Sequence, residues 1–174
     1  MLFRDKAILI VDDSTLNRQI LSKLLAGEYE LLEASDGVAA LSLLHERRGD
    51  ILCVILDLQM PVMDGRELLR RMQAENLSAV PTLVTTASDD LQTEQECLQL
   101  GAWDFVRKPY DAAILQLRLQ SIIARSQLKA LEQVQYLSEH DPLTGLYNRA
   151  KFFSATREML SAHPNTDFVF VRID

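Results

Sequence analysis

Three aspartates carry the clearest chemical signal in this sequence of 174 residues. Asp12 and Asp13 directly follow one short apolar run, and Asp57 directly follows another. If the two runs form neighbouring strands, the three carboxylates meet at one edge of a sheet. Two carboxylates about 4 Å apart repel each other by about 4 kcal/mol at an effective dielectric constant of about 20. A cluster of three therefore needs bound protons or a cation, and its hard oxygen ligands suit Mg²⁺.

A hydroxyl and an ammonium group fall at two further strand ends. Thr86 closes one apolar run, and Lys108 follows another, just before Pro109. Groups of these kinds bind phosphoryl oxygens. An aspartate carboxylate is a competent nucleophile for phosphorus when a metal offsets the negative charge. We therefore predict that Asp57 is phosphorylated. The simpler alternative, that the first two aspartates only cap the next helix, leaves Asp57 unexplained.

Five apolar runs alternate with helical patterns and would position these groups. They are rich in Ile, Leu and Val at consecutive positions, which is typical of parallel strands buried on both faces. The runs are Ala7–Val11, Tyr29–Ala34, Ile51–Leu56, Thr82–Thr86 and Trp103–Val106. The alternation predicts an α/β fold with a five-stranded, doubly wound parallel sheet, in which the first and third strands are neighbours. Ligands of such sheets bind beyond the carboxyl ends of the strands.

A long C-terminal helix is predicted next, because residues 111–139 contain no Gly or Pro and are mostly good helix formers. Asp111 can cap its start. A stripe of apolar residues along it could form a dimer seam: Leu117, Ala124, Leu128, Leu131 and Val134. The alternative, a helix that lies on its own domain, stands equally open for residues 114–123. Pro142 ends the pattern, and a helix over Ala150–Ala162 and a strand over Phe168–Ile173 follow.

Composition sets limits on the class of protein. A net charge of −7 argues against a nucleic-acid partner, which requires an excess of Lys and Arg. The longest apolar runs are far shorter than the roughly 20 residues of a membrane helix. The two cysteines, Cys53 and Cys97, lack the spacing of metal ligands and suit a reducing compartment. We expect a cytoplasmic protein without membrane or nucleic-acid partners.

The motifs around these residues resemble the response-regulator receiver family over about residues 4–125. The matching strings are Ile10-Val11-Asp12-Asp13, Asp57-Leu58-Gln59-Met60-Pro61-Val62-Met63-Asp64-Gly65, Thr86-Ala87 and Lys108-Pro109. A flavodoxin-like fold is implied, with a histidine kinase or phosphotransfer protein as the phosphate donor. The haloacid-dehalogenase family also forms a phospho-aspartate, but it needs a second aspartate two residues later. Gln59 stands there instead, and this alternative is rejected.

The resemblance also assigns roles within the site. It implies that Asp13, Asp57 and the backbone carbonyl of Gln59 bind Mg²⁺ directly, while Asp12 acts largely through water. Thr86 and Lys108 would contact the phosphoryl group, and the Lys108–Pro109 bond would be cis. By periodicity alone, Phe105 is an aromatic residue packed in a strand. The family pattern makes it the aromatic switch.

A second string, from Asp141 to Arg149, reads Asp-Pro-Leu-Thr-Gly-Leu-Tyr-Asn-Arg. Physically it predicts a helix break, a turn at Thr144-Gly145 and a helix cap at Asn148. It resembles the opening of GGDEF domains, the diguanylate cyclase family. That resemblance makes Asp174 a candidate cyclase metal ligand. If Asp174 is instead the second acid of an Asp-x-Asp pair, Arg172 takes the first place and the metal site is degenerate.

These observations predict a receiver domain over 1–125, a helical linker over 126–140 and the truncated N-terminal fragment of a GGDEF domain over 141–174. The fragment lacks the GGDEF signature, so we expect GTP to bind only to a longer parent protein, as a diguanylate cyclase. We expect a homodimer through the fourth and fifth helices and the linker helix. The alternative is a non-catalytic, phosphorylation-dependent dimerisation or protein-binding module with a degenerate GGDEF domain.

Overall fold

The computed structural model describes residues 6–87, 91–164 and 166 of the chain. It divides into two compact units, Met1–Gln127 and Leu128–Asp174, and the boundary lies within one helix. The strands are β1 (Ala7–Val11), β2 (Glu30–Ala34), β3 (Ile51–Asp57), β4 (Thr82–Thr86) and β5 (Asp104–Arg107). The helices are α1 (Thr15–Leu25), α2 (Gly37–Glu46), α3 (Gly65–Ala74), α4 (Leu91–Gln99), α5 (Ala112–Glu139) and α6 (Arg149–Ala162).

The first unit is built on one parallel sheet with the strand order β2-β1-β3-β4-β5. The prediction that the first and third strands are neighbours is therefore confirmed. The order reverses direction at β1 and β3, which places the carboxyl ends of these two strands at the switch point of the sheet. Asp12 and Asp57 lie at this edge.

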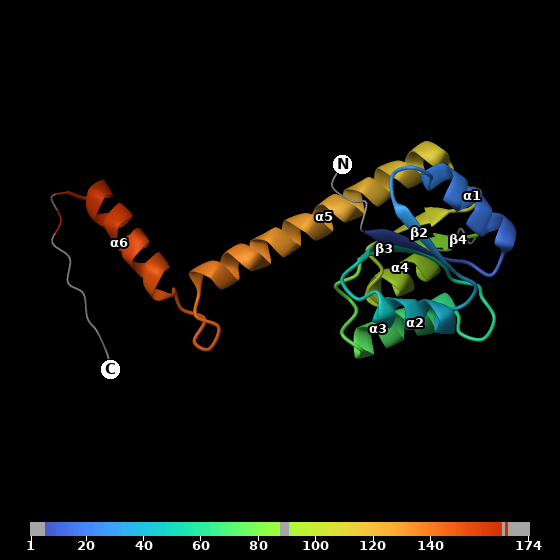
Figure 1. Ribbon diagram of the computed structural model, residues 1–174, viewed down its shortest axis with the longest axis horizontal. Helices are drawn as coiled ribbons and strands as arrows, with labels where there is room; N and C mark the ends of the chain where they lie inside the picture. Colours follow the sequence, from blue (N-terminus) through green and yellow to red (C-terminus); the bar gives the residue numbers. More distant parts are fainter. Residues whose placement is uncertain (1–5, 88–90, 165, 167–174) are drawn as a thin grey trace. The chain divides into compact units, whose positions relative to one another are not determined.

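Helices cover both faces of the sheet, as a doubly wound fold requires (Figure 1). Alternation along β1 shows why, since Ile8 and Ile10 pack on one face while Leu9 and Val11 pack on the other. The first face is covered by α1 and the buried residues of α5, and the second by α2, α3 and α4. Both faces are apolar, and the continuous Ile, Leu and Val runs follow from this burial.

Two strands differ from the predicted bounds by one residue at the ends that carry the site. β3 includes Asp57, which pairs with Thr85 across the ladder. β5 runs one residue later than predicted, because Arg107 pairs with Thr86 although it is exposed and charged. Backbone pairing, rather than the end of the apolar run, sets these limits.

The predicted long helix is present as α5, and Asp111 caps it by accepting a hydrogen bond from the backbone N–H of Ile114 at 3.0 Å. The part that packs on the sheet buries four residues: Leu115, Leu119, Ile122 and Ile123. Leu128, Leu131 and Val134 are exposed. Within the described residues, no helix is long and apolar enough to cross a membrane.

In the second unit, the end of α5 and the start of α6 are joined by a tightly bonded turn. Asp141 accepts hydrogen bonds from the backbone N–H groups of Leu143 and Thr144 at 3.1 and 2.9 Å. Asn148 caps α6, and its side-chain amide also donates to the carbonyl of Ser138 at 2.6 Å. The predicted break, turn and cap are confirmed. The predicted strand over Phe168–Ile173 lies outside the described residues.

Candidate functional site

The three predicted aspartates come together at the edge of the sheet. One carboxylate oxygen from each of Asp12, Asp13 and Asp57 lies within 4.8 Å of the others. Asp12 and Asp57 are buried, with 1% and 7% of their surface exposed, whereas Asp13 is exposed. Carboxylate oxygens grouped this closely are the hard ligands that Mg²⁺ prefers. The donor set therefore fits this metal.

Lys108, the residue directly after β5, supplies positive charge to the cluster. Its ammonium nitrogen lies 2.8 Å from an oxygen of Asp12 and 3.1 Å from an oxygen of Asp57. The backbone N–H of Lys108 donates to the carbonyl of Thr86 at 2.8 Å, which ties the ends of β4 and β5 together. The Lys108–Pro109 peptide bond is cis, as the resemblance implied.

At Asp57 and at Lys108, burial shifts the pKa in one direction and the oppositely charged partners shift it in the other. Burial raises the pKa of Asp57 above its ordinary value of 3.8, and the hydrogen bond from Lys108 only partly offsets this effect. Burial lowers the pKa of Lys108, but its hydrogen bonds to Asp12 and Asp57 help to outweigh this and raise it to about 12. The ammonium group thus stays charged at neutral pH, beside a carboxylate that is costly to ionise.

The turn between β1 and α1 holds Asp12 in a network of donors. Its carboxylate accepts from the backbone N–H of Ser14 at 2.9 Å and from the side-chain amide of Asn17 at 3.1 Å. Ser14, not Asp13, is the N-cap of α1. The alternative that Asp13 serves as the helix cap is therefore wrong, and its exposed carboxylate is left to face the cluster.

The loop after the acceptor strand approaches its backbone closely. Asp64 caps α3 by accepting from the backbone N–H of Glu67 at 2.8 Å, and the Gly65 N–H donates to the Leu58 carbonyl at 3.1 Å. A β-carbon on Gly65 would overlap the carbonyl oxygen of Asp57. Gln59 is exposed in this loop, and its part as a carbonyl ligand stays a prediction.

Thr86 and Phe105 occupy the adjacent strands β4 and β5. Thr86 is buried at the end of β4. Phe105 is partly buried and packs against the core on the face of α2, α3 and α4. The Arg118 guanidinium from α5 lies 5.6 Å from the centre of its ring. The switch role of Phe105 stays a prediction.

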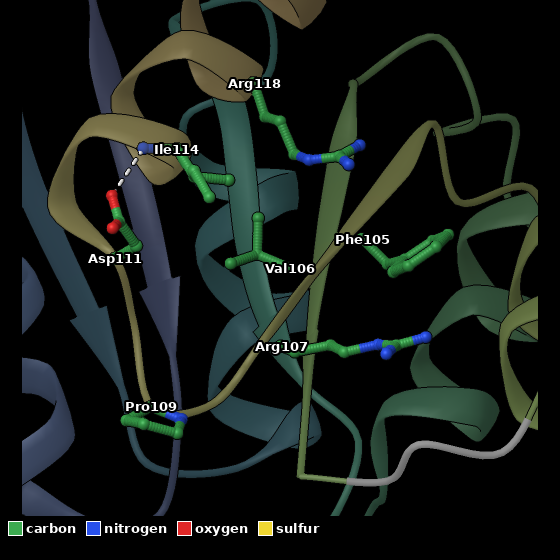
Figure 2. Close-up of a pocket in the computed structure, with 7 residues that line it drawn as sticks. All are labelled: Phe105, Val106, Arg107, Pro109, Asp111, Ile114 and Arg118. Atoms are coloured by element: carbon green, nitrogen blue, oxygen red, sulfur yellow. Dashed lines mark hydrogen bonds between the residues drawn. The ribbon is translucent and has the colours of Figure 1, made fainter.

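A pocket of about 430 Å³ lies on the face formed by β5 and α5. The side chains of Phe105, Arg107 and Arg118 extend toward the same side in Figure 2, and Val106 and Ile114 also line the pocket. None of the three clustered aspartates lines this pocket. The donor geometry of the three aspartates, rather than this pocket, identifies the candidate site.

Sequence reasoning missed two residues at the cluster, Asn17 and Arg18. Asn17 binds both oxygens of Asp12, and Arg18 donates to the backbone of the acidic turn. Both lie on the first turns of α1, only a few residues after Asp12 and Asp13. This short separation in the sequence could have identified them as neighbours of the cluster. The candidate cyclase ligand Asp174 and the alternative residue Arg172 lie outside the described residues.

Comparison with known proteins gives one consistent result. The model of the response regulator receiver domain matches residues 8–120. The chain is 34% identical over 142 residues to the probable transcriptional regulator ycf27 of Guillardia theta, covering 81% of this chain and 52% of that protein. It is 33% identical over 171 residues to the response regulator MprA of Mycobacterium ulcerans, covering 90% and 72%.

One similar solved structure is described as having a second domain. A protein described as a two-component system response regulator/GGDEF domain protein superposes with a TM-score of 0.67 at 26% identity. The match covers 72% of this chain and 52% of that one. The chain also spans about half or less of the length of the first curated relatives that it matches.

Proposed function

Because this chain belongs to the response regulator receiver family, we propose that it transmits a signal by accepting a phosphoryl group on Asp57. Receivers of this family take phosphate from histidine kinases and bind Mg²⁺ at an acidic pocket. The observation that carries the proposal is the gathering of three carboxylates within 4.8 Å, beside the ammonium group of Lys108. A metal bound there would offset charge on the phosphoryl oxygens.

Each side chain has a distinct part in the transfer. A carboxylate oxygen of Asp57 attacks phosphorus, a new O–P bond forms, and the donor's bond to phosphorus breaks with its electron pair. A histidine nitrogen released in this way takes a proton from water. Asp13, Asp57 and the Gln59 carbonyl would hold Mg²⁺ directly, with Asp12 acting through water. Lys108 and Thr86 would then bind the phosphoryl oxygens.

The output of phosphorylation would pass through Phe105. Contact between Thr86 and the phosphoryl group would let the ring turn inward, which changes the face formed by α4, β5 and α5. That face would dimerise together with the exposed stripe of α5. A shift from about 1% to about 99% of one state requires roughly 5.5 kcal/mol of preference.

Acetyl phosphate tests the acceptor directly. Incubation with Mg²⁺ should add the mass of one phosphoryl group, and peptide mapping should place it on Asp57. Asp57→Asn should take up none, and chelation of the metal should abolish uptake by the wild-type chain. Asp50→Asn changes an aspartate that precedes β3, at the opposite end of that strand from Asp57, and should behave as the wild type. Unchanged mass in the wild-type chain would overturn the proposal.

We further propose that residues 141–174 open an output domain of the GGDEF class in a longer protein. The string from Asp141 to Arg149, its turn and the Asn148 cap support this reading. A similar solved protein bears a GGDEF domain, whereas ycf27 bears the name of a transcriptional regulator. The activity would be condensation of GTP, controlled by Asp57.

The alternative output is a degenerate domain that acts by protein contact alone. The two outputs differ in the sequence after Asp174 and in GTP turnover by the longer protein. An intact GGDEF string with turnover that rises on phosphorylation supports a cyclase. Loss of that string, with a change only in oligomeric state, supports the binding module.

A further inference from the structure

Arg18 makes an unusual set of contacts on the first turns of α1. Its Nη1 donates to the backbone carbonyl of Asp12 at 2.7 Å and to that of Asp13 at 3.3 Å. Its Nε donates to the Glu33 carboxylate of β2 at 3.0 Å, and its Nη2 to the Thr15 hydroxyl at 3.3 Å. Only 15% of the side chain is exposed. One guanidinium group thus holds the backbone of two neighbouring acidic residues.

The position of the Arg18 guanidinium near the N-terminus of α1 is electrostatically unfavourable. The N-terminus of a helix carries partial positive charge, so a cation is favoured at the other end. Arg18 nevertheless folds back over the N-terminal turn and is fixed there by Glu33. The carbonyl groups that it binds belong to Asp12 and Asp13, whose carboxylates repel each other in the cluster. The arrangement therefore opposes the tendency of the acidic turn to spread apart.

We propose that Arg18 is a positioning residue for the acidic cluster. By holding the two carbonyl groups, it fixes the turn so that the carboxylates of Asp12 and Asp13 meet that of Asp57. Glu33 holds Arg18 in turn, so β2 supports a site to which it contributes no ligand. This inference rests on the proposed function, because it concerns how the residues for Mg²⁺ and phosphoryl transfer are oriented.

The chain offers a matched control in Arg47. This arginine also pairs with a glutamate of β2, Glu30, at 3.0 Å, but it lies far along the chain from the acidic turn and follows α2. Arg18→Met and Arg47→Met each remove an ion pair with β2, and Arg47→Met also removes one with Asp50 at 3.6 Å. Only Arg18→Met removes bonds to the acidic turn. Arg18→Lys keeps the charge but cannot reach both carbonyl groups and Glu33 together.

Isothermal titration with MgCl₂ provides a measurement that does not depend on phosphorylation. Loss of an outer contact that orients metal ligands weakens metal binding by about 10- to 100-fold, and we expect Arg18→Met to fall in this range. Arg18→Lys should be intermediate, and Arg47→Met should match the wild type. If Arg18→Met does not fold, Glu33→Gln, which removes the charge that anchors the guanidinium, should weaken Mg²⁺ binding by a smaller factor.

Unchanged Mg²⁺ affinity in Arg18→Met or, if that variant does not fold, in Glu33→Gln would overturn the inference, as would equal weakening in Arg47→Met. Failure of the proposed function looks different, because the wild-type chain itself would then take up no phosphoryl group. A wild type that is phosphorylated and an Arg18→Met variant with normal Mg²⁺ binding would refute only the role of Arg18.

Discussion

The ammonium group of Lys108, the residue after β5, lies 3.1 Å from a carboxylate oxygen of Asp57, which ends β3. The same group contacts Asp12 at 2.8 Å. Three ionised carboxylates and one ammonium leave two formal negative charges in the cluster. A divalent cation would neutralise this remainder, so Lys108 and the metal would together balance the charge of the three carboxylates.

The pKa of Lys108 predicts how stability depends on alkaline pH. Because folding raises this pKa from 10.5 to about 12, the stabilisation is complete below 10.5 and is lost as the pH rises through about 12. The raised pKa corresponds to about 2 kcal/mol. Urea unfolding should therefore show that wild type and Lys108→Met differ most well below pH 10.5, and that the difference shrinks toward pH 12. A difference that is constant with pH would contradict the assigned contacts.

Asp57→Asn should raise stability at neutral pH when Mg²⁺ is absent. Folding raises the pKa of this carboxyl, so the folded state holds its proton more tightly than the unfolded state. Stability from this group is therefore highest near or below pH 3.8 and falls as the pH rises through the folded-state pKa. The variant should have the higher urea midpoint at pH 7, and Asp50→Asn should not. A lower midpoint for Asp57→Asn would mean that the acceptor stabilises the fold.

Gly65→Ala should both destabilise the protein and slow phosphorylation. The added methyl group meets the backbone of Asp57, and overpacking of this kind costs about 1–3 kcal/mol. Gly27→Ala is the comparison, because its methyl group meets no neighbouring atom and only its backbone conformation is strained. Both variants should lose stability in urea, but only Gly65→Ala should take up phosphate slowly from acetyl phosphate. Equal phosphorylation rates in the two variants would show that the loop after β3 can move to accommodate the methyl group without disturbing Asp57.

Asn148→Ala should loosen the start of α6. The side chain caps the helix through the backbone N–H of Lys151 and also donates to Ser138. Loss of a cap costs about 1 kcal/mol, and amide hydrogen exchange in the first turns of α6 should become faster. Ser161→Ala, which removes a side-chain bond near the other end of this helix, should leave those amides unchanged. If the amides in the first turns of α6 exchange as slowly in Asn148→Ala as in the wild type, other groups must cap this helix.

Leu131→Asp should weaken the proposed homodimer. Leu131 is 64% exposed, so a charge there costs little in a monomer but much in an apolar seam. Analytical ultracentrifugation after treatment with acetyl phosphate should show less dimer than in the wild type. Gln133→Asp adds the same charge at another exposed position of α5 and should have a smaller effect. Identical behaviour of the two variants would place the interface elsewhere.

The sequence was sufficient to locate the principal groups of the site, because parallel strands bring their carboxyl ends to one edge. Asp57, Thr86 and Lys108 could therefore be placed by the ends of apolar runs. Arg18 and Asn17 could not, since their contacts depend on how side chains fold back over a helix turn. The end of β5 was also missed, because exposed Arg107 continues the backbone ladder with Thr86. Patterns of burial predict elements well, but not polar contacts between them.

Trp103 stands immediately before β5 and is the only tryptophan in the chain. The Arg125 guanidinium of α5 lies over its ring, 4.6 Å from the ring centre, and donates to its carbonyl at 3.1 Å. Trp103 is also two residues from Phe105. The protein therefore has its single tryptophan where a strand meets a helix, and this fluorophore can be excited selectively at wavelengths that tyrosine does not absorb. Its emission would report movement at this junction in real time, without any attached dye.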